Sequence, residues 1–186
     1  FEEIERYQAE GAWEKAGEVL GQTARSLEQG GADFIVICTN TMHKVIDHIQ
    51  SKINIPILHI ADATAAQIKE SKIQTVGLLG TKYTMEQDFY KSRLESNGIQ
   101  VIVPNPDDRE AVNKIIYEEL CLGKIDQKSR EYYKQVIQGL IDSGADGIIL
   151  GCTEIGLLVK PEDAEVPMFD TTYIHACEAV NMSLKS

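Results

Sequence analysis

The chain has 186 residues, of which 43% are hydrophobic and 25% charged, a balance typical of a globular protein that can bury a core. Its formal net charge of −11 argues against a protein that binds nucleic acid or an anionic membrane, because both partners need clustered Lys and Arg. An anionic small substrate remains compatible with this charge, because a few backbone N–H groups can bind it locally.

The cysteines and the start of the chain indicate a compartment. Four cysteines lie at positions 38, 121, 152 and 177, and none forms the C-x-x-C pair of a zinc ribbon or a thioredoxin-type site. No apolar run approaches the roughly 18 residues of a membrane helix. No signal peptide is recognisable, although the chain begins with Phe1 rather than Met. We therefore expect reduced thiols and a cytoplasmic location.

The expected strands are short and almost continuously apolar, which is typical of a parallel sheet buried on both faces. They lie at 34–38, 56–60, 75–79, 101–103, 147–150 and 166–169. Apolar residues spaced by three and four predict helices at 13–29, 41–52, 62–71, 84–96, 109–122 and 130–143, with one more at the carboxyl terminus. This alternation predicts a doubly wound α/β fold.

A long-range repeat is the most informative feature of the sequence. GADFIVICT at 31–39 returns as GADGIILGCT at 144–153, and IPIL at 55–58 is loosely matched by VPMFDT at 166–171. Two similar α/β halves are therefore expected. The alternative, that any two βα units share such residues, does not explain why each strand ends in Cys-Thr.

The repeat puts Cys38 and Cys152 at equivalent positions, at the carboxyl ends of strands, where open α/β sheets bind ligands. Each is followed by residues that favour a helix start, so we expect the positive helix end to favour a thiolate. Two opposed thiols suit racemisation, in which one removes a proton from a carbon and the other returns one to the opposite face.

Three segments carry a resemblance to a known family. CTNTMHK at 38–44, GTKYTMEQDFY at 80–90 and GCTEIGLLV at 151–159 resemble the aspartate/glutamate racemases. The similarity is greatest to the bacterial branch that acts on L-aspartate and L-glutamate with broad specificity. It extends over the whole chain.

This resemblance implies two pseudo-symmetric, doubly wound α/β halves with the active site in the cleft between them, no pyridoxal phosphate, no metal and a homodimer. We expect residues 1–73 and 170–186 to form the first half, incomplete at its amino terminus, and 74–169 to form the second. The substrate would be a small acidic amino acid.

The resemblance also assigns residues. Cys38 and Cys152 match the catalytic cysteines. Residues that match substrate-binding segments are Thr39, Asn40, Thr41, Thr81, Thr153 and, in a separate segment, Gln8. Glu154 is a further candidate because it lies two residues after a thiol; the alternative is a carboxylate that only begins a helix.

The chain departs from the family at its start. Members begin with a strand and a Gly-rich loop whose counterpart in the second half is VGLLGT at 76–81, and this lead-in is missing here. The chain is thus expected to lack an amino-terminal segment. Alternatives to an active racemase are an inactive truncated form, a ligand-binding pseudoenzyme, or an isomerase or decarboxylase of the same superfamily.

The remaining candidates are weaker. Cys121 and Cys177 lie within predicted helices and are expected to pack in the core. His59 and His175 could support the site, whereas His43 and His48, five residues apart, do not have the spacing of a metal-binding pair. Asp107 and Asp108 are expected to cap a helix.

Overall fold

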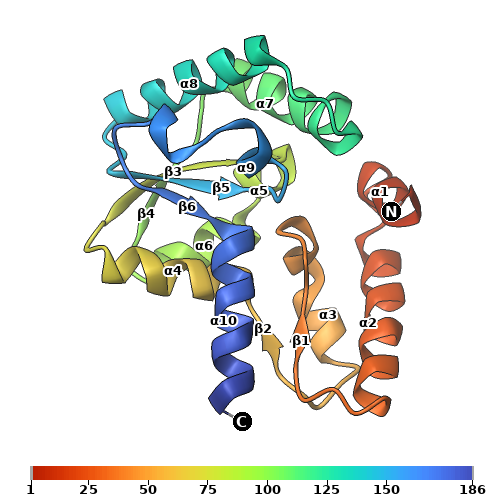
Figure 1. Ribbon diagram of the computed structural model, residues 1–186. Coiled ribbons are helices and arrows are strands. Elements are labelled where there is room, and N and C mark those ends of the chain that lie inside the picture. The colour runs from red at the N-terminus through yellow and green to blue at the C-terminus, as the bar shows by residue number, and fades with distance from the viewer. Residues whose placement is uncertain (1, 186) are drawn as a thin grey trace. The chain divides into compact units, whose positions relative to one another are not determined.

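The computed structural model describes residues 2–185 and divides into two compact units (Figure 1). The first unit contains the described residues up to Ile37 together with Met42–His59. The second contains Cys38–Thr41 and the chain from Ile60 onwards. The segment that carries the first thiol therefore belongs to the second unit.

The first unit is built on a pair of parallel strands, with Ile35 opposite Ile57. Its elements are α1 (Glu2–Ala9), α2 (Trp13–Gln29), β1 (Ile35–Val36), most of η1 (Thr41–Val45), α3 (Ile46–Gln50) and β2 (Ile57–Leu58). Buried side chains from α2, β1 and α3, among them Ala16 and Ile49, form its core.

The second unit is a four-stranded parallel sheet in the order β4-β3-β5-β6. Its strands are β3 (Thr75–Gly80), β4 (Gln100–Ile102), β5 (Gly147–Gly151) and β6 (Met168–Asp170). Its helices are α4 (Ile60–Glu70), α5 (Lys82–Glu86), α6 (Asp88–Ser96), α7 (Pro106–Glu118), η2 (Leu120–Leu122), α8 (Gln127–Asp142), α9 (Ile155–Leu158), η3 (Pro161–Asp163) and α10 (Thr171–Lys185).

Helices cover both faces of this sheet. In Figure 1, α7 and α8 lie on one side and α4 and α6 on the other. Leu79 and Ile148 point into the core beneath α7 and α8, whereas Leu78 and Ile149, their chain neighbours, point into the core beneath α4 and α6. Both faces of the sheet are buried, which is why the sequences of these strands are continuously apolar.

The structure confirms the expected mixed α/β fold with parallel sheets, and strands form at all six expected places. The helix expected at 84–96 is split into α5 and α6, and the one at 41–52 begins as a 3-10 turn. Asp107 and Asp108 lie in the first turn of α7 and do not cap it. The cap is Asn105, whose side chain accepts from the Asp108 amide at 3.0 Å.

The repeat is visible in the backbone of both units. Gly31 and Gly144 have φ angles of 95° and 98°, a conformation that glycine adopts without strain. The amide after each glycine donates to the carbonyl of a leucine in the preceding helix, at 3.1 Å from Ala32 and 3.0 Å from Ala145. The compact units are defined by packing and not by the repeat, so the expected division into halves at 73 and 170, whose end residues 1 and 186 lie outside the described chain, stays a prediction.

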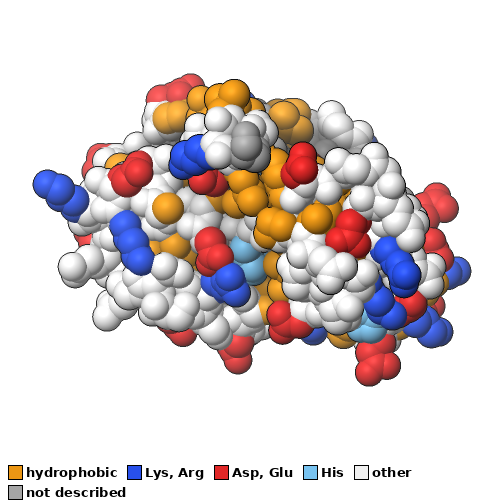
Figure 2. Space-filling model, turned by 90° about the horizontal axis from the view of Figure 1, so that it is seen from below, with side chains coloured by type: hydrophobic (Ala, Val, Ile, Leu, Met, Phe, Trp, Pro, Cys, Tyr) orange, Lys and Arg blue, Asp and Glu red, His pale blue; other side chains and the backbone are white. Residues whose placement is uncertain are grey.

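The described chain has no membrane-spanning helix, and one of its helices exposes hydrophobic side chains. No helix within residues 2–185 is long and apolar enough to cross a membrane. α10 exposes Tyr173, Val180 and Leu184 to solvent. Figure 2 views the molecule from the side toward which α10 runs, and hydrophobic side chains are visible there between charged ones.

Candidate functional site

The ends of β3 and β5 form the floor of the candidate site. These neighbouring strands end in register at Gly80 and Gly151, so Thr81 and Cys152 follow at the same edge of the sheet. The strand ends approach too closely for side chains: a Cβ added to Gly151 would lie 2.7 Å from the Leu79 carbonyl oxygen. One added to Gly80 would lie 2.9 Å from the Gly151 carbonyl oxygen.

The segment Cys38–Thr41 lies at this same edge. The Thr41 and Thr81 hydroxyl oxygens are 3.1 Å apart. The Asn40 amide Nδ2 donates to the Thr171 hydroxyl at 3.0 Å, and that hydroxyl donates to the Leu150 carbonyl at 2.8 Å. The residue two positions after the first thiol is thus joined, through Thr171, to the residue two positions before the second.

Asn40 also carries an unused hydrogen-bond acceptor. Its side chain is 2% exposed, and its Oδ1 has no partner within the structure. A buried acceptor left without a donor costs about 1–3 kcal/mol. Because Nδ2 is held by Thr171, the amide cannot rotate to solve this, and a donor from a bound ligand would.

Cys152 is partly buried and is held as a protonated thiol. Its Sγ donates to Glu154 Oε2 at 3.1 Å, and the same oxygen accepts from the Thr153 hydroxyl at 2.6 Å. Burial, followed by the negative charge of Glu154, raises the pKa of Cys152 well above its ordinary value. The expectation that a helix start favours a thiolate here is wrong, because α9 has only four residues and its cap position holds a carboxylate.

The other thiols differ from Cys152. Cys38 is exposed to solvent. Cys121, in η2, packs against the core as expected, and burial together with Glu154 raises its pKa too, which indicates that it lies near the Cys152 site. Cys177 was expected in the core but is exposed on α10, where it lines the groove beside α4 and β6.

Several predicted residues lie in the first unit. Gln8 donates from Nε2 to the sulfur of Met42, the residue directly after Thr41, at 3.8 Å. His43 and His59 are buried with their ring centroids 4.5 Å apart. His48 is paired with Glu18 at 3.2 Å.

No group of three or more His, Cys, Asp or Glu within the described chain is arranged to hold a metal ion. A groove of about 700 Å³ lies between α4, β6 and α10, where Glu70, Asp170 and Glu178 line it. None of its lining residues is Lys or Arg, so it does not suit an acidic ligand.

The sequence did not reveal two contributors. Thr171, 0% exposed, joins the two thiol-bearing segments; its place in the repeat, after Asp170, was the one available signal. Arg130 contacts Asp163 across 33 residues of sequence, a separation at which no motif is readable.

Comparisons with known proteins identify the family of this chain. The family model described as Asp/Glu/Hydantoin racemase matches residues 1–179. The broad specificity amino-acid racemase RacX of Bacillus subtilis is 30% identical over 165 residues, which cover 87% of this chain and 69% of RacX. The glutamate racemase of Aquifex pyrophilus is 28% identical, over 88% of this chain and 61% of that enzyme.

Solved structures agree as well. A crystal structure described as an Asp/Glu racemase candidate from Yersinia pestis has a TM-score of 0.92 and 58% identity, covering 99% of this chain and 80% of its own. An aspartate racemase homologue from Pyrococcus horikoshii has a TM-score of 0.83 and 38% identity, covering 95% and 77%. The resemblance drawn from the three sequence segments is thereby confirmed, and this chain belongs to the Asp/Glu/hydantoin racemase family, whose relatives named here include amino-acid racemases.

Proposed function

We propose that this protein racemises an acidic amino acid, aspartate or glutamate, with Cys38 and Cys152 as its two acid/base groups. The observation that carries the proposal is the hydrogen-bonded connection Asn40–Thr171–Leu150, which ties both Cys-Thr segments to one edge of the sheet. Ligands bind at such edges in open α/β sheets. The relatives support the reaction class.

The protons balance in this scheme without pyridoxal phosphate or metal. One sulfur, as thiolate, takes the α-proton, and the electrons of the broken C–H bond pass to Cα and its carboxylate. The other sulfur, as thiol, gives its proton to the opposite face of Cα. Cys152, kept protonated by burial and by Glu154, is the proton donor, and Cys38, which is exposed, takes the α-proton in that direction.

The polar groups suit an amino acid. The free Asn40 Oδ1 is an acceptor for the substrate ammonium group. The hydroxyls of Thr39, Thr41 and Thr81 are donors for its carboxylates, whereas Thr153, whose hydroxyl donates to Glu154, is assigned to substrate binding by resemblance alone. Gln8 is assigned to substrate binding by resemblance alone.

Solvent exchange tests the proposal. The chain is incubated in deuterated buffer with L-aspartate, L-glutamate and a panel of neutral amino acids, and deuterium at Cα and enantiomer composition are measured. The expected result is deuterium incorporation with formation of the D-isomer, unaffected by a chelator or by added pyridoxal phosphate. The Cys38→Ser and Cys152→Ser variants serve as controls.

Other results of this assay would indicate a different function. Loss of carbon dioxide would indicate a decarboxylase, and binding without exchange would indicate a ligand-binding pseudoenzyme. Turnover that depends on added pyridoxal phosphate would refute the two-thiol mechanism. A homodimer is also proposed, and light scattering that gave the mass of one chain would contradict it.

A further inference from the structure

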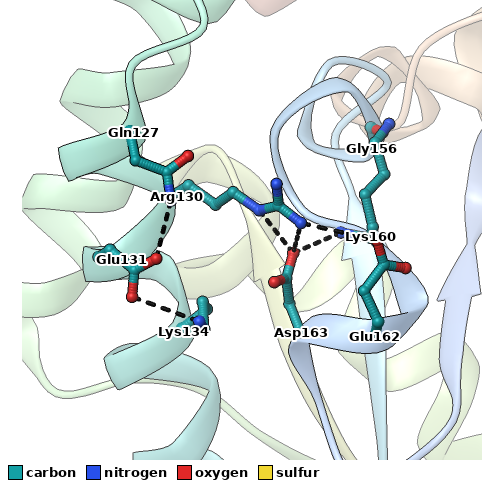
Figure 3. A network of polar contacts seen from close by, with 8 residues as sticks. All are labelled: Gln127, Arg130, Glu131, Lys134, Gly156, Lys160, Glu162 and Asp163. Carbon is teal, nitrogen blue, oxygen red and sulfur yellow. Dashed lines mark hydrogen bonds and ion pairs between the residues drawn. The ribbon is translucent and has the colours of Figure 1, made fainter.

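Two consecutive residues at the start of α8 hold the segments that flank Cys152. Ser129 donates from Oγ to Glu119 Oε2 at 2.6 Å, directly before η2. Arg130 reaches the other way, and both its Nε and its Nη2 lie 2.9 Å from Asp163 Oδ2 (Figure 3). Because η2 carries Cys121 and η3 follows α9, this first turn of α8 anchors both neighbours of the thiol.

Asp163 is the centre of the network drawn in Figure 3. Its side chain is 6% exposed, and its Oδ2 also accepts from the Lys160 amide at 2.8 Å. Burial alone would raise the pKa of Asp163, but the Arg130 guanidinium and the Lys160 amide hold it below its usual value. Asp163 is therefore a carboxylate at neutral pH, and a buried carboxylate with several donors fixes the geometry of the groups around it.

The network continues to the residues next to Cys152. The Lys160 ammonium group donates to the Gly156 carbonyl at 2.6 Å. Gly156 lies in the single turn of α9, where the Leu157 amide donates to the Glu154 carbonyl at 2.9 Å. A displacement of η3 thus displaces α9 and with it the carboxylate that accepts from Cys152.

We propose that Arg130 is a positioning residue for the Cys152–Glu154 pair: by holding Asp163 it keeps the α9–η3 loop where Glu154 meets the thiol. The inference rests on the proposed function only in giving Cys152 an acid's role. Arg130 touches neither thiol nor substrate, so it acts through Asp163, Lys160 and Gly156.

A purely structural role is the alternative, and the chain offers a matched control. In the same unit Arg93 contacts Asp62 through the same two nitrogens, one to each carboxylate oxygen, at 2.7 and 2.6 Å, joining α6 to α4. Loss of either arginine removes one Arg–Asp pair. Only the loss of Arg130 should change the surroundings of Cys152.

The experiment measures the reactivity of Cys152 in the full chain without substrate. Wild type, Arg130→Gln, Arg130→Lys and Arg93→Gln are alkylated with iodoacetamide at a series of pH values, and the Cys152 peptide is quantified by mass spectrometry. Thermal unfolding is recorded for each. Since no turnover is needed, a chain that fails the exchange assay still answers this question.

In Arg130→Gln, we expect the alkylation midpoint of Cys152 to fall by about one pH unit. A lower pKa raises the thiolate fraction about tenfold at neutral pH, partly offset by lower nucleophilicity, so the rate should rise at least threefold. In Arg130→Lys the alkylation midpoint should fall by less than in Arg130→Gln, because the lysine keeps a positive charge near Asp163. The groups that face Cys152 are unchanged in these variants, namely Glu154, Cys121 and Tyr133. A shift in the alkylation midpoint of Cys152 would therefore come from movement of the α9–η3 loop.

Arg93→Gln should lower the unfolding temperature and leave the Cys152 profile at its wild-type position. An unshifted profile in a folded Arg130→Gln, with a loss of stability equal to that of Arg93→Gln, would overturn the proposal. If Arg130→Gln does not fold, Asp163→Asn decides, because Arg130 keeps Glu162 as a partner at 3.7 Å. An unshifted Cys152 in Asp163→Asn would also overturn it.

Discussion

The segments 31–39 and 144–153 share a turn and a strand, yet they present their thiols differently. Both begin at a glycine with positive φ, and in both strands an isoleucine amide, Ile35 or Ile148, donates to the carbonyl of the proline directly before the next strand, each at 2.9 Å. Cys38 emerges exposed, whereas Cys152 is partly buried against a carboxylate. The repeat gives both thiols the same place after a strand, whereas at Cys152 burial and the carboxylate two places on, Glu154, raise the pKa of the thiol.

Replacement of either thiol should have the largest effect. Cys38→Ser and Cys152→Ser should each reduce racemisation by about a thousandfold or more, because a serine hydroxyl neither gives nor takes a proton readily at neutral pH. Cys121→Ala alters packing next to the same site, and its racemisation rate should stay within a few fold of the wild-type rate. Chiral chromatography measures all three. A nearly active Cys152→Ser would remove that residue from the mechanism.

Neutralising Glu154 should make Cys152 more reactive. In Glu154→Gln the negative charge beside Cys152 is lost, so the pKa of Cys152 should fall, and its alkylation at pH 7 should rise by about tenfold for each unit of that fall, less any loss of nucleophilicity. The alkylation rate of Cys38 in the same sample is the internal control. Equal shifts at both thiols would mean that the variant had loosened the fold as a whole.

The raised pKa of Cys152 should also make stability depend on pH. In the unfolded chain this thiol ionises near pH 8.5, whereas in the folded chain it stays protonated to higher pH. The unfolding free energy should therefore be level below about pH 8.5 and fall above it by up to about 1.4 kcal/mol per pH unit. Denaturant titrations of wild type and Cys152→Ala isolate the effect, since the variant should lose that part of the slope. Parallel curves would contradict the raised pKa.

The smallest expected effect is the loss of stability when the glycine of either repeated turn, Gly31 or Gly144, is replaced. Gly31→Ala and Gly144→Ala meet no atom within 4 Å, so each should be destabilised only by its positive φ, by about 1–2 kcal/mol. Near-equal losses in chemical denaturation would agree with equivalent turns. A loss at one glycine and none at the other would show that the two turns differ in solution.

The sequence predicted the sheet better than it predicted the site. Continuous apolar runs located all six strands, because both faces of the larger sheet are covered. α9 was expected only as a helix start after Cys152, and η3 was not predicted, because four and three residues are too few to show a helical period. The two thiols and Glu154 were predicted as candidates from their place after a strand, and their role in the site stays a prediction. The protonation of Cys152 was not, because burial outweighs the field of a one-turn helix and burial is a property of packing.

The glycines that end β3 and β5 should not tolerate substitution in a mutational scan. Neither Gly80 nor Gly151 has a side chain, yet a single methyl at either would collide with a neighbouring carbonyl oxygen. In a library in which every position is varied and variants are selected by growth on the reaction product, both glycines should be depleted as strongly as the two cysteines. A second selection, for the amount of folded protein, would separate the two classes, because only the glycine variants should disappear from it.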